Sequence, residues 1–547
     1  MASKGDVAGN THPEHDEETN DAAVSVPDTG DGGDSSKLKM IITLVKKCLG
    51  VKDIASMRLS LPASLLEPIP NLEYWHYLDR PDLFAAINDS PDPLERMVAV
   101  LRFNFAKDLK FIHGKVCKPY NSVLGEHFRA HWDVVPVRYP SDDPAQLPIQ
   151  HLYLSEAAAA SSISQIPSSE TPRSDTASTK SGVSSLKSST SRVASVSDTP
   201  TKSTPATSPE LLETELDAKM SNLSLNGLNG GEEPPAVLIE GDDPAPTADL
   251  PRVRIAYLTE QVSHHPPVSA YVASCPSRDL EMVGIDQISA KVSGMNVRVS
   301  PGSFNKGIYI HGTGGHAEGE KYHLTHPTAS VNGILRGNFY ITVSDSTIIT
   351  CSGAKSKDGQ QLRTVVEYKE ESWLGRAHFL CEGVIHSYDP SGIAHHEWTK
   401  VKHVPHSRVV AQFHGSWKHL IKWKLASEPD SDYRPLIDLS QLQVIPKVVR
   451  PLEKQLPTES RKLWENVSKN LLSKQYGDAN KHKYAIEQKQ RDDAAERKKK
   501  GIKFTPKYFG DTYDDGVPMV LPEARRALEE ELATEAAHAL EHLKIVA

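Results

Sequence analysis

Aromatic residues are scarce in this chain of 547 residues, at 6% Phe, Trp and Tyr. The scarcity is concentrated in one segment, because residues 154–256 contain no aromatic residue, and 25 of the 48 residues in 161–208 are Ser or Thr. Such a segment cannot bury enough apolar surface to offset the entropy lost on ordering. We therefore expect a disordered insertion over residues 154–250, and fewer folded domains than the length alone suggests.

The chain also has few cysteines and no long apolar run. Its five cysteines are scattered and form no Cys-x-x-Cys pair, which indicates neither a disulfide framework nor a zinc finger and favours a reducing compartment. No stretch of about 18 apolar residues is present, and the acidic N-terminus lacks the apolar core of a signal peptide. We expect a soluble cytoplasmic protein whose contact with membranes is peripheral.

Charge is unevenly distributed along the chain. Residues 1–36 carry a net charge of −8 and residues 156–250 another −8, so the rest of a chain with net charge −9 carries +7. A basic folded part favours an anionic partner, such as a nucleic acid, a phosphorylated ligand or a cytosolic membrane leaflet. The run of lysines at 498–500 is too short to indicate nucleic-acid binding and is typical of a charged helix end.

Helical periodicity is clearest at two places before the insertion. Apolar residues recur at helical spacing at Leu38, Ile41, Ile42, Val45, Cys48 and Leu49. Ser35 or Ser36 is the expected cap of this helix and Gly50 its end, and the helix either packs on the core or touches membranes. A second helix is predicted over residues 93–105, with Pro93 in its first turn. Residues 59–68 are interrupted by prolines and cannot form one helix.

After the insertion the apolar pattern changes to period two. Alternating segments separated by Gly, Pro, Asp and Ser turns occur at residues 253–257, 268–272, 297–299, 308–310, 339–343, 364–368 and 409–413. They predict a large antiparallel sheet or barrel. Beyond residue 425 we expect helices, the last over residues 522–543. The Gly-rich residues 311–319 lack the Lys-Ser/Thr ending of a phosphate loop and are expected to connect a hairpin.

The densest polar cluster is Glu-Gln-Val-Ser-His-His-Pro-Pro at residues 260–267, between two predicted strands. The prolines fix the backbone while His264 and His265 keep their ring donors, and from the residues alone structure and anion binding remain equally open. A nucleophilic role for Ser263 is weaker, because the Gly-x-Ser-x-Gly elbow is absent. A metal site is disfavoured, since adjacent side chains of an extended segment point to opposite faces.

These eight residues resemble, without a substitution, the signature of the oxysterol-binding-protein-related lipid-transfer family. Residues 118–126, Lys-Pro-Tyr-Asn-Ser-Val-Leu-Gly-Glu, are similar to a second family motif and depart from it at Tyr120 and Ser122. Residues 450–461 are similar to the segment that follows the family's barrel. The resemblance covers residues 37–153 and about 251–515. No pleckstrin-homology domain, ankyrin repeat or double-Phe motif is found, so the chain is similar to short members, nearest to fungal carriers of phosphatidylserine.

The resemblance implies a β-dominated α+β fold, a large and nearly closed antiparallel β-barrel with a lipid tunnel, an N-terminal lid and a C-terminal helical region. The expected divisions are a disordered acidic tail (1–36), the lid and first part of the lipid-binding domain (37–153), the disordered insertion (154–250), the barrel (251–425), a C-terminal helical part (426–520) and a last helix (521–547). Lid and tunnel entrance are expected to use Leu38, Ile41, Ile42, Val45, Leu49, Leu61, Leu65 and Leu66.

The resemblance also implies a site at the tunnel mouth for the headgroup of phosphatidylinositol 4-phosphate. The residues that match the family's site are Lys118, Asn121, His264, His265, Lys483, Glu487 and Arg491. The last three are spaced by four residues, which places them on one helix face. Glu487 then lies between the two cations and is expected to hold both in place. Without the resemblance, this triplet would be interpreted as a solvated charged face. Cations and neutral donors suit a phosphate monoester. No catalytic residue, cofactor or metal ion is expected.

The second lipid is predicted from a shorter match. Residues 61–67, Leu-Pro-Ala-Ser-Leu-Leu-Glu, resemble a stretch of the members that carry phosphatidylserine, which makes that lipid the expected cargo and sterol the next candidate. We expect a monomeric exchanger that binds anionic membrane surfaces and no nucleic acid, at contacts of the endoplasmic reticulum with the plasma membrane or Golgi. Two alternatives remain: a lipid-responsive sensor or scaffold, and a lipid hydrolase that uses Ser263 beside a histidine.

Overall fold

The computed structural model describes residues 24–25, 34–54, 59–113, 118–140, 146–149, 252–294, 296–334, 339–354, 359–371 and 377–534. The predicted insertion over residues 154–250, most of the predicted acidic tail and residues 535–547 lie outside the described residues. All described elements belong to one compact unit, formed by residues 1–153 and 237–547. Among the described helices, none combines the length and the apolar character that crossing a bilayer requires.

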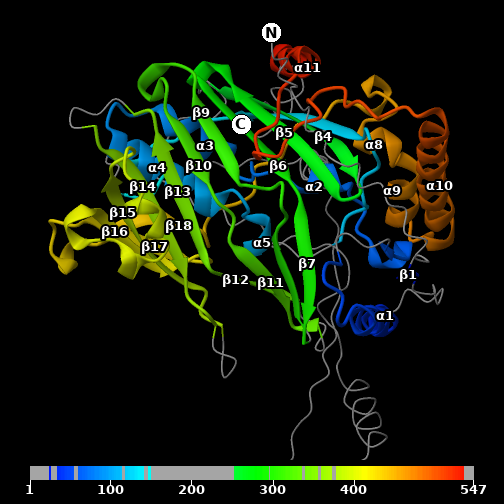
Figure 1. Cartoon of the computed structure of the whole chain (residues 1–547), viewed down its shortest axis with the longest axis horizontal. Helices are drawn as coiled ribbons and strands as arrows, with labels where there is room; N and C mark the ends of the chain where they lie inside the picture. Colours follow the sequence, from blue (N-terminus) through cyan, green and yellow to red (C-terminus); the bar gives the residue numbers. More distant parts are fainter. Residues whose placement is uncertain are drawn as a thin grey trace, which may run out of the picture. The chain divides into compact units, whose positions relative to one another are not determined.

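The centre of this unit is a twelve-stranded antiparallel sheet (Figure 1). Its strands are, in order, β18 (Arg434–Asp438), β17 (Leu420–Leu425), β16 (Val409–Ser416), β15 (Leu380–Tyr388), β14 (Gln361–Tyr368), β13 (Ser346–Ser352), β10 (Lys321–Leu324), β9 (Ile308–Gly312), β6 (Leu280–Asp286), β5 (Pro267–Cys275), β4 (Val253–His264) and β3 (His127–Val134). In the part of the chain that the structure describes, β18 and β3 are its edges. The predicted antiparallel, β-dominated fold is confirmed as an open sheet with helices.

A second antiparallel sheet has four strands, in the order β12 (Tyr340–Ser344), β11 (Thr328–Asn332), β8 (Asn296–Pro301) and β7 (Ile288–Ser293). Each of the seven predicted alternating segments overlaps a strand of one sheet or the other. The Gly-rich residues 311–319 connect the paired strands β9 and β10, as predicted. The expectation of helices directly after residue 425 is wrong for β18. Its Leu436 and Ile437 are buried, and Pro435 is tolerated because β18 is an edge strand.

Strand β3 was not predicted, although its sequence alternates. Phe128, Ala130, Trp132 and Val134 face the apolar core, and the residues between them are polar. The polar face is covered by helix α11 (Pro522–Ala533), where Glu531 forms an ion pair with Arg129, 2.9 Å from its Nε atom, and lies 3.1 Å from His131 Nδ1. Both faces of β3 are therefore buried, and the charged residues that hide the alternation in the sequence are satisfied by a distant helix.

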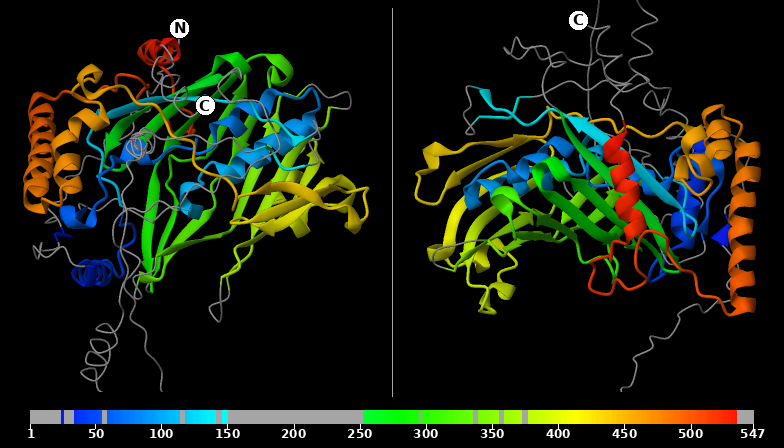
Figure 2. Two further views of the ribbon diagram at one scale, coloured as in Figure 1. Left: turned by 180° about the vertical axis from the view of Figure 1, so that it is seen from behind. Right: turned by 90° about the horizontal axis from the view of Figure 1, so that it is seen from above.

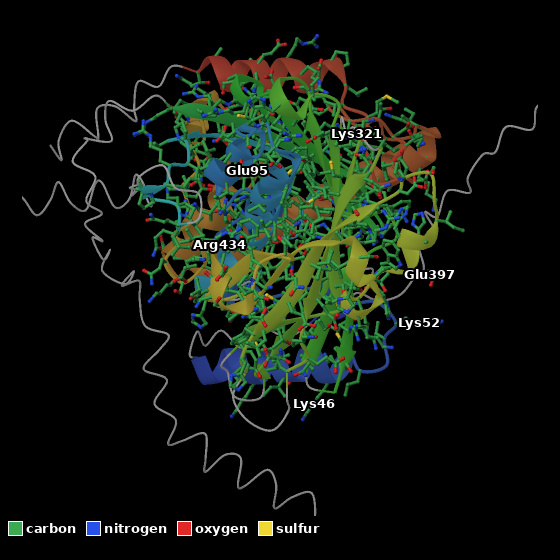
Figure 3. All side chains as sticks on the ribbon, turned by 90° about the vertical axis from the view of Figure 1, so that its left-hand side faces the viewer. Lys46, Lys52, Glu95, Lys321, Glu397 and Arg434 are labelled. Atoms are coloured by element: carbon green, nitrogen blue, oxygen red, sulfur yellow. The ribbon has the colours of Figure 1, made fainter. Side chains whose placement is uncertain are left out.

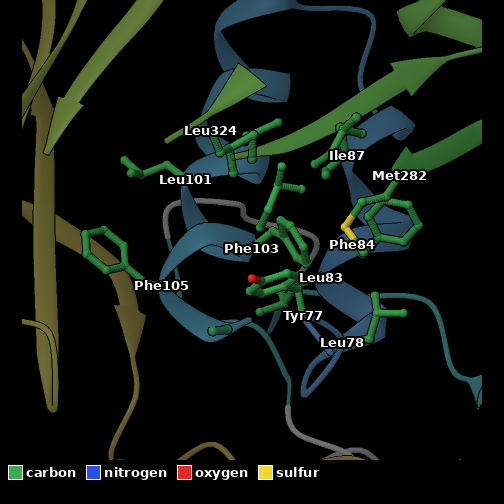
Figure 4. Packing of buried hydrophobic residues seen from close by; sticks show 14 of the residues in the cluster. Tyr77, Leu78, Leu83, Phe84, Ile87, Leu101, Phe103, Phe105, Met282 and Leu324 are labelled. Atoms are coloured by element: carbon green, nitrogen blue, oxygen red, sulfur yellow. The ribbon is translucent and has the colours of Figure 1, made fainter. Parts of the chain in front are cut away.

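Four helices before β3 fill the concave side of the main sheet: α2 (Asn71–Tyr74), α3 (Pro81–Ala85), α4 (Pro93–Ala106) and α5 (Lys110–His113). The predicted helix at 93–105 is confirmed as α4, and Asp92 Oδ1 caps it by accepting from the backbone N of Leu94 at 2.7 Å. Phe84 of α3 and Phe103 of α4 lie with ring centroids 5.6 Å apart in the main apolar core (Figure 4). Phe105 continues this core to Phe413 of β16.

The helix predicted from the apolar spacing of residues 38–49 is present as α1 (Asp34–Lys47). It starts before residue 38, so Ser35 and Ser36 lie inside the helix and are not its caps, while Gly50 follows it with a φ of +83°. Val45 and Cys48 are buried against Val292 and Ile334 beside the four-stranded sheet, with Ile41 and Ile42 packed around them. Of the two open interpretations, the structure shows a packed helix. Lys46 on α1 and Lys52 after it are exposed (Figure 3).

Helices α8 (Ser460–Leu463), α9 (Glu465–Leu472) and α10 (Tyr476–Lys500) follow the main sheet, and Figure 2 shows α9 and α10 side by side at the edge where β3 and β4 lie. Residues 498–500 form the last turn of α10, as predicted for a charged helix end. Residues 59–68 do not form one helix, as predicted, but the short strand β2 (Leu59–Ser60), parallel to β1 (Val24–Ser25), and the turn η1 (Ala63–Leu65).

Candidate functional site

Three segments that are distant in the sequence meet at a small hollow of about 200 Å³, a volume that includes its part open to solvent. The loop before β3 contributes Lys118 and Asn121, helix α10 contributes Lys483, and the segment around η1 contributes Leu61 and Leu66. Three predicted headgroup residues and two predicted entrance residues are thus brought together. Leu65, predicted with them, is half-buried in η1.

The loop that carries Lys118 and Asn121 is anchored from beneath by Tyr120, which is fully buried. The Tyr120 ring lies 4.9 Å from the Trp464 ring, its hydroxyl is 2.9 Å from Ser468 Oγ, and its backbone N donates to Ile69 O. Asn121 is exposed, and its Oδ1 accepts from Lys118 Nζ at 2.6 Å. The departure from the family motif at Tyr120 therefore supports the loop and leaves the two polar residues at the hollow.

Helix α10 presents Lys483 to the hollow with little exposure to water. Its Nζ atom lies 2.6 Å from Glu487 Oε1, one turn along the helix, and 8% of the Lys483 side chain is exposed. Arg491 is exposed, donates from Nη2 to Gln488 Oε1 at 2.9 Å and lies over the Tyr484 ring. The prediction that Glu487 holds a neighbouring cation is confirmed for Lys483. Arg491 itself is held by Gln488, one turn before it on α10, and by Tyr484, two turns before it.

His264 and His265 lie at the end of β4 with ring centroids 4.5 Å apart and ring planes at 64°. The expectation that they point to opposite faces as in an extended strand does not hold, because β4 ends at His264 and His265 lies in the turn that follows. His264 is half-buried and His265 exposed. Among the described residues, no group of three His, Cys, Asp or Glu side chains is arranged to hold a metal ion.

Backbone hydrogen bonds join the two family-like motifs. The backbone N of Gly125 donates to Gln261 O at 3.0 Å, and the backbone N of Gln261 donates to Glu126 O at 2.8 Å. The loop with Lys118 and the strand end with the two histidines therefore lie at the same end of the paired strands β3 and β4. Asn480 of α10 joins the third segment by accepting from the backbone N of Ala63 at 2.8 Å.

Two buried carboxyl groups next to this site were not among the predicted functional residues. Glu126 is fully buried and accepts from Val123 N at 3.0 Å, Ser460 Oγ at 2.7 Å and Trp464 Nε1 at 3.0 Å. Burial raises the pKa of Glu126 to about 7 against these hydrogen bonds, which lower it. Glu260 is 1% exposed, accepts from the backbone N atoms of Lys507 and Tyr508 at 2.8 Å each, and has its pKa raised by burial. The available signal was that each of them is the one acidic residue of its motif, at 118–126 and at 260–267.

Comparison with known families matches residues 40–157 and 247–520 of this chain to the family described as oxysterol-binding protein. The unmatched residues between the two ranges lie within the predicted insertion. A protein of Schizosaccharomyces pombe, oxysterol-binding protein-like protein 1, is 39% identical over 510 residues, 92% of this chain and 93% of that protein. Oxysterol-binding protein homolog 7 of Saccharomyces cerevisiae is 27% identical over 290 residues, 52% of this chain and 61% of that protein.

Among solved structures, the crystal structure of the Osh1 ORD domain in complex with cholesterol is similar to this chain with a TM-score of 0.50. The alignment covers 90% of this chain and 89% of that one at 16% sequence identity. This similarity supports the fold described above, in which a large antiparallel sheet is combined with helices.

Proposed function

Since this chain belongs to the oxysterol-binding protein family, we propose that it is a lipid-transfer protein that binds phosphatidylinositol 4-phosphate and exchanges it for a second lipid between membranes. The observation that carries the proposal is the meeting of Lys118, Asn121 and Lys483 with Leu61 and Leu66 in one hollow. Cationic and polar side chains there adjoin apolar ones, which is the combination that a lipid with a phosphorylated headgroup requires.

The polar part of the hollow suits a phosphate monoester. Two ammonium groups and one amide converge there, and the low exposure of Lys483 strengthens its attraction for a doubly charged phosphate. In the proposal, His264 and His265 add ring donors, Arg491 adds a guanidinium from α10, and Glu487 holds Lys483 in place. An uncharged headgroup would offer these cations no negative charge beyond that of Glu487.

The apolar part of the proposal is a lipid tunnel enclosed by the main sheet as a nearly closed barrel, with α1 as its lid. Carrying about 30 methylene groups bare through water would cost roughly 20 kcal/mol, at about 0.8 kcal/mol each. A container that closes over the acyl chains removes most of this barrier. The packing of the apolar side of α1 on the four-stranded sheet supports a closed lid.

Phosphatidylserine is the favoured second cargo, from the stretch at residues 61–67, and sterol is the next candidate; the similar Osh1 domain was crystallised with cholesterol. The two lipids would compete for one tunnel. A gradient of the phosphoinositide can therefore move the second lipid against its own gradient, with about 1.4 kcal/mol available for each tenfold concentration ratio. The proposed setting is the cytoplasmic surface of anionic membranes, where the endoplasmic reticulum meets the plasma membrane or Golgi.

The test is transfer of phosphatidylinositol 4-phosphate between liposomes by Lys118→Ala, Lys483→Ala and the double variant His264→Ala/His265→Ala. Loss of a charge-assisted phosphate contact is expected to lower transfer about tenfold or more for each variant. Lys489→Ala is the matched control, because Lys489 lies on the same helix with 76% of its side chain exposed and pairs with Asp493. Unchanged transfer in all three site variants would reject the assignment.

The same assay separates the alternatives. A hydrolase would convert labelled lipid to cleaved products, whereas a transfer protein leaves it intact. A sensor or scaffold would bind the lipid tightly and yet move it no faster than spontaneous exchange.

A further inference from the structure

Two buried acids, Glu126 and Glu260, lie at one end of the paired strands β3 and β4, and neither lines the hollow. His127 is paired with Glu260 across the two strands, and the backbone N of Gln261 donates to Glu126 O. The two acids therefore occupy adjacent positions, not paired with each other, at the end of these strands where the Lys118 loop and the two histidines also lie.

Their hydrogen-bond partners lie on opposite sides of α10 in the sequence. Glu126 accepts from Ser460 at the start of α8 and from Trp464 between α8 and α9, the segment that leads into α10. Glu260 accepts from the backbone of Lys507 and Tyr508, in the segment that leaves α10. One carboxyl group thus binds the segment that precedes α10, and the other binds the segment that follows it.

A third contact joins the middle of the helix to the same loop. The Oε1 atom of Gln490 accepts from the backbone N of Leu124 at 3.1 Å, and Gln490 lies between Glu487 and Arg491 along α10. Gly125 is also close to the segment after the helix, because a Cβ at this position would lie 3.3 Å from the Phe504 ring. The paired strands β3 and β4 and the loop before β3 therefore contact the chain before α10, within α10 and after α10.

Several of these contacts are hydrogen bonds, which have a preferred direction, and not only apolar packing. A buried carboxyl group is costly unless donors satisfy it, and its removal leaves those donors unpaired in the interior. Two buried acids whose donors flank one helix therefore fix the position of that helix more narrowly than apolar packing of the same area.

We propose that Glu126 and Glu260 are positioning residues that clamp α10. They thereby set the distance between Lys483 and the other residues of the proposed site, which are Lys118, Asn121, His264 and His265. The inference rests on the proposed phosphoinositide site. It assigns no contact with lipid to either acid, and the clamp acts through the helix.

The test is a double-mutant cycle between Glu260→Gln and Lys483→Ala, with extraction of phosphatidylinositol 4-phosphate from liposomes as the measurement. Glu260→Gln is expected to weaken extraction about tenfold when Lys483 is present and less than about twofold when it is absent, because the clamp acts through Lys483. Glu320→Gln is the control, since Glu320 is equally buried but is bound to Arg96 and Tyr322 within the main core. Its effect should add to that of Lys483→Ala. Additive effects of Glu260→Gln would overturn the proposal.

Trp464→Phe and Ser460→Ala test the Glu126 side while the acid itself is kept, in case Glu126→Gln fails to fold. Trp464→Phe keeps an aromatic ring at this position, although a smaller one, and removes the N–H donor, and it should show the same dependence on Lys483.

A measurement without lipid separates the clamp from the proposed function. Hydrogen exchange of residues 476–508 should accelerate in Glu260→Gln and Trp464→Phe but not in Glu320→Gln. If the wild type fails to extract the phosphoinositide while this exchange pattern holds, the function is wrong and the clamp stands. Unchanged exchange in residues 476–508 would overturn the clamp.

Discussion

Lys483 Nζ lies 2.6 Å from Glu487 Oε1, with 8% of the lysine side chain and 23% of the glutamate side chain exposed. The carboxyl group compensates an ammonium that also lines the hollow with Lys118. A phosphate that enters the hollow would take over part of this role. The ion pair therefore keeps the site folded in the absence of lipid and at the same time competes with the proposed ligand.

Glu487→Gln is predicted to lower the free energy of unfolding of the lipid-free protein by about 1 kcal/mol, because Lys483 loses its partner. Bound phosphatidylinositol 4-phosphate should replace the missing charge, so the rise in Tm on lipid binding should be larger in the variant than in the wild type. Thermal unfolding with and without lipid measures both values. An equal or smaller rise in the variant would contradict this role of Glu487.

Val45→Asp is predicted to open the lid. Val45 is buried between α1 and the four-stranded sheet, and an unpaired charge there costs on the order of 3 kcal/mol, which exceeds what one short helix contributes. Bound lipid should leave faster and α1 should become sensitive to protease, while the unfolding of the main sheet stays near that of the wild type. Leu49→Asp is the control, because Leu49 is 52% exposed. Protease resistance of α1 in Val45→Asp would count against the packed lid.

Glu126→Gln is predicted to change the pH dependence of stability. Since burial raises the pKa of Glu126 from 4.5 to about 7, the folded protein binds this proton more tightly than the unfolded chain. The stabilising contribution of the protonated acid is therefore complete below about pH 4.5 and is lost as the pH rises through about 7, a change of about 3 kcal/mol.

The measurement is the free energy of unfolding of wild type and Glu126→Gln from pH 4.5 to 8, taken as a difference so that other titrating groups cancel. Relative to the variant, the wild type should lose stability as the pH rises. A constant difference would show that Glu126 does not titrate in this range.

Deletion of residues 2–23 is predicted to tighten binding to anionic liposomes. This segment carries six acids and one lysine, and its removal leaves β1 and α1 intact. Less repulsion from an anionic leaflet should strengthen binding a few-fold at low salt, and the difference should disappear at high salt, where surface charges are screened. Sedimentation with liposomes at both salt concentrations measures it. A variant of full length with the six acids changed to Asn or Gln separates charge from length, and a gain only on deletion would argue against the electrostatic explanation.

The sequence by itself determined the local elements and the residue types of the candidate site. Periodicity placed α1, α4 and seven strands of the two sheets, because the side-chain period is a property of the local backbone. The prolines of residues 59–68 excluded one helix there for an equally local reason. The motifs at 118–126 and 260–267 supplied the site residues through resemblance, before any contact between them was known.

Only the tertiary structure decided which of these residues meet. Lys118 and Lys483 line one hollow because the order of the strands and the packing of α8 and α9 bring α10 to the paired strands β3 and β4. The periodicity of a sequence does not encode such contacts. The close approach of His264 to His265 depends on where β4 ends, because His265 lies in the turn after the strand. The roles of Glu126 and Glu260 depend on donors far away in the sequence, since burial and hydrogen bonding are properties of the folded surroundings and not of the residue.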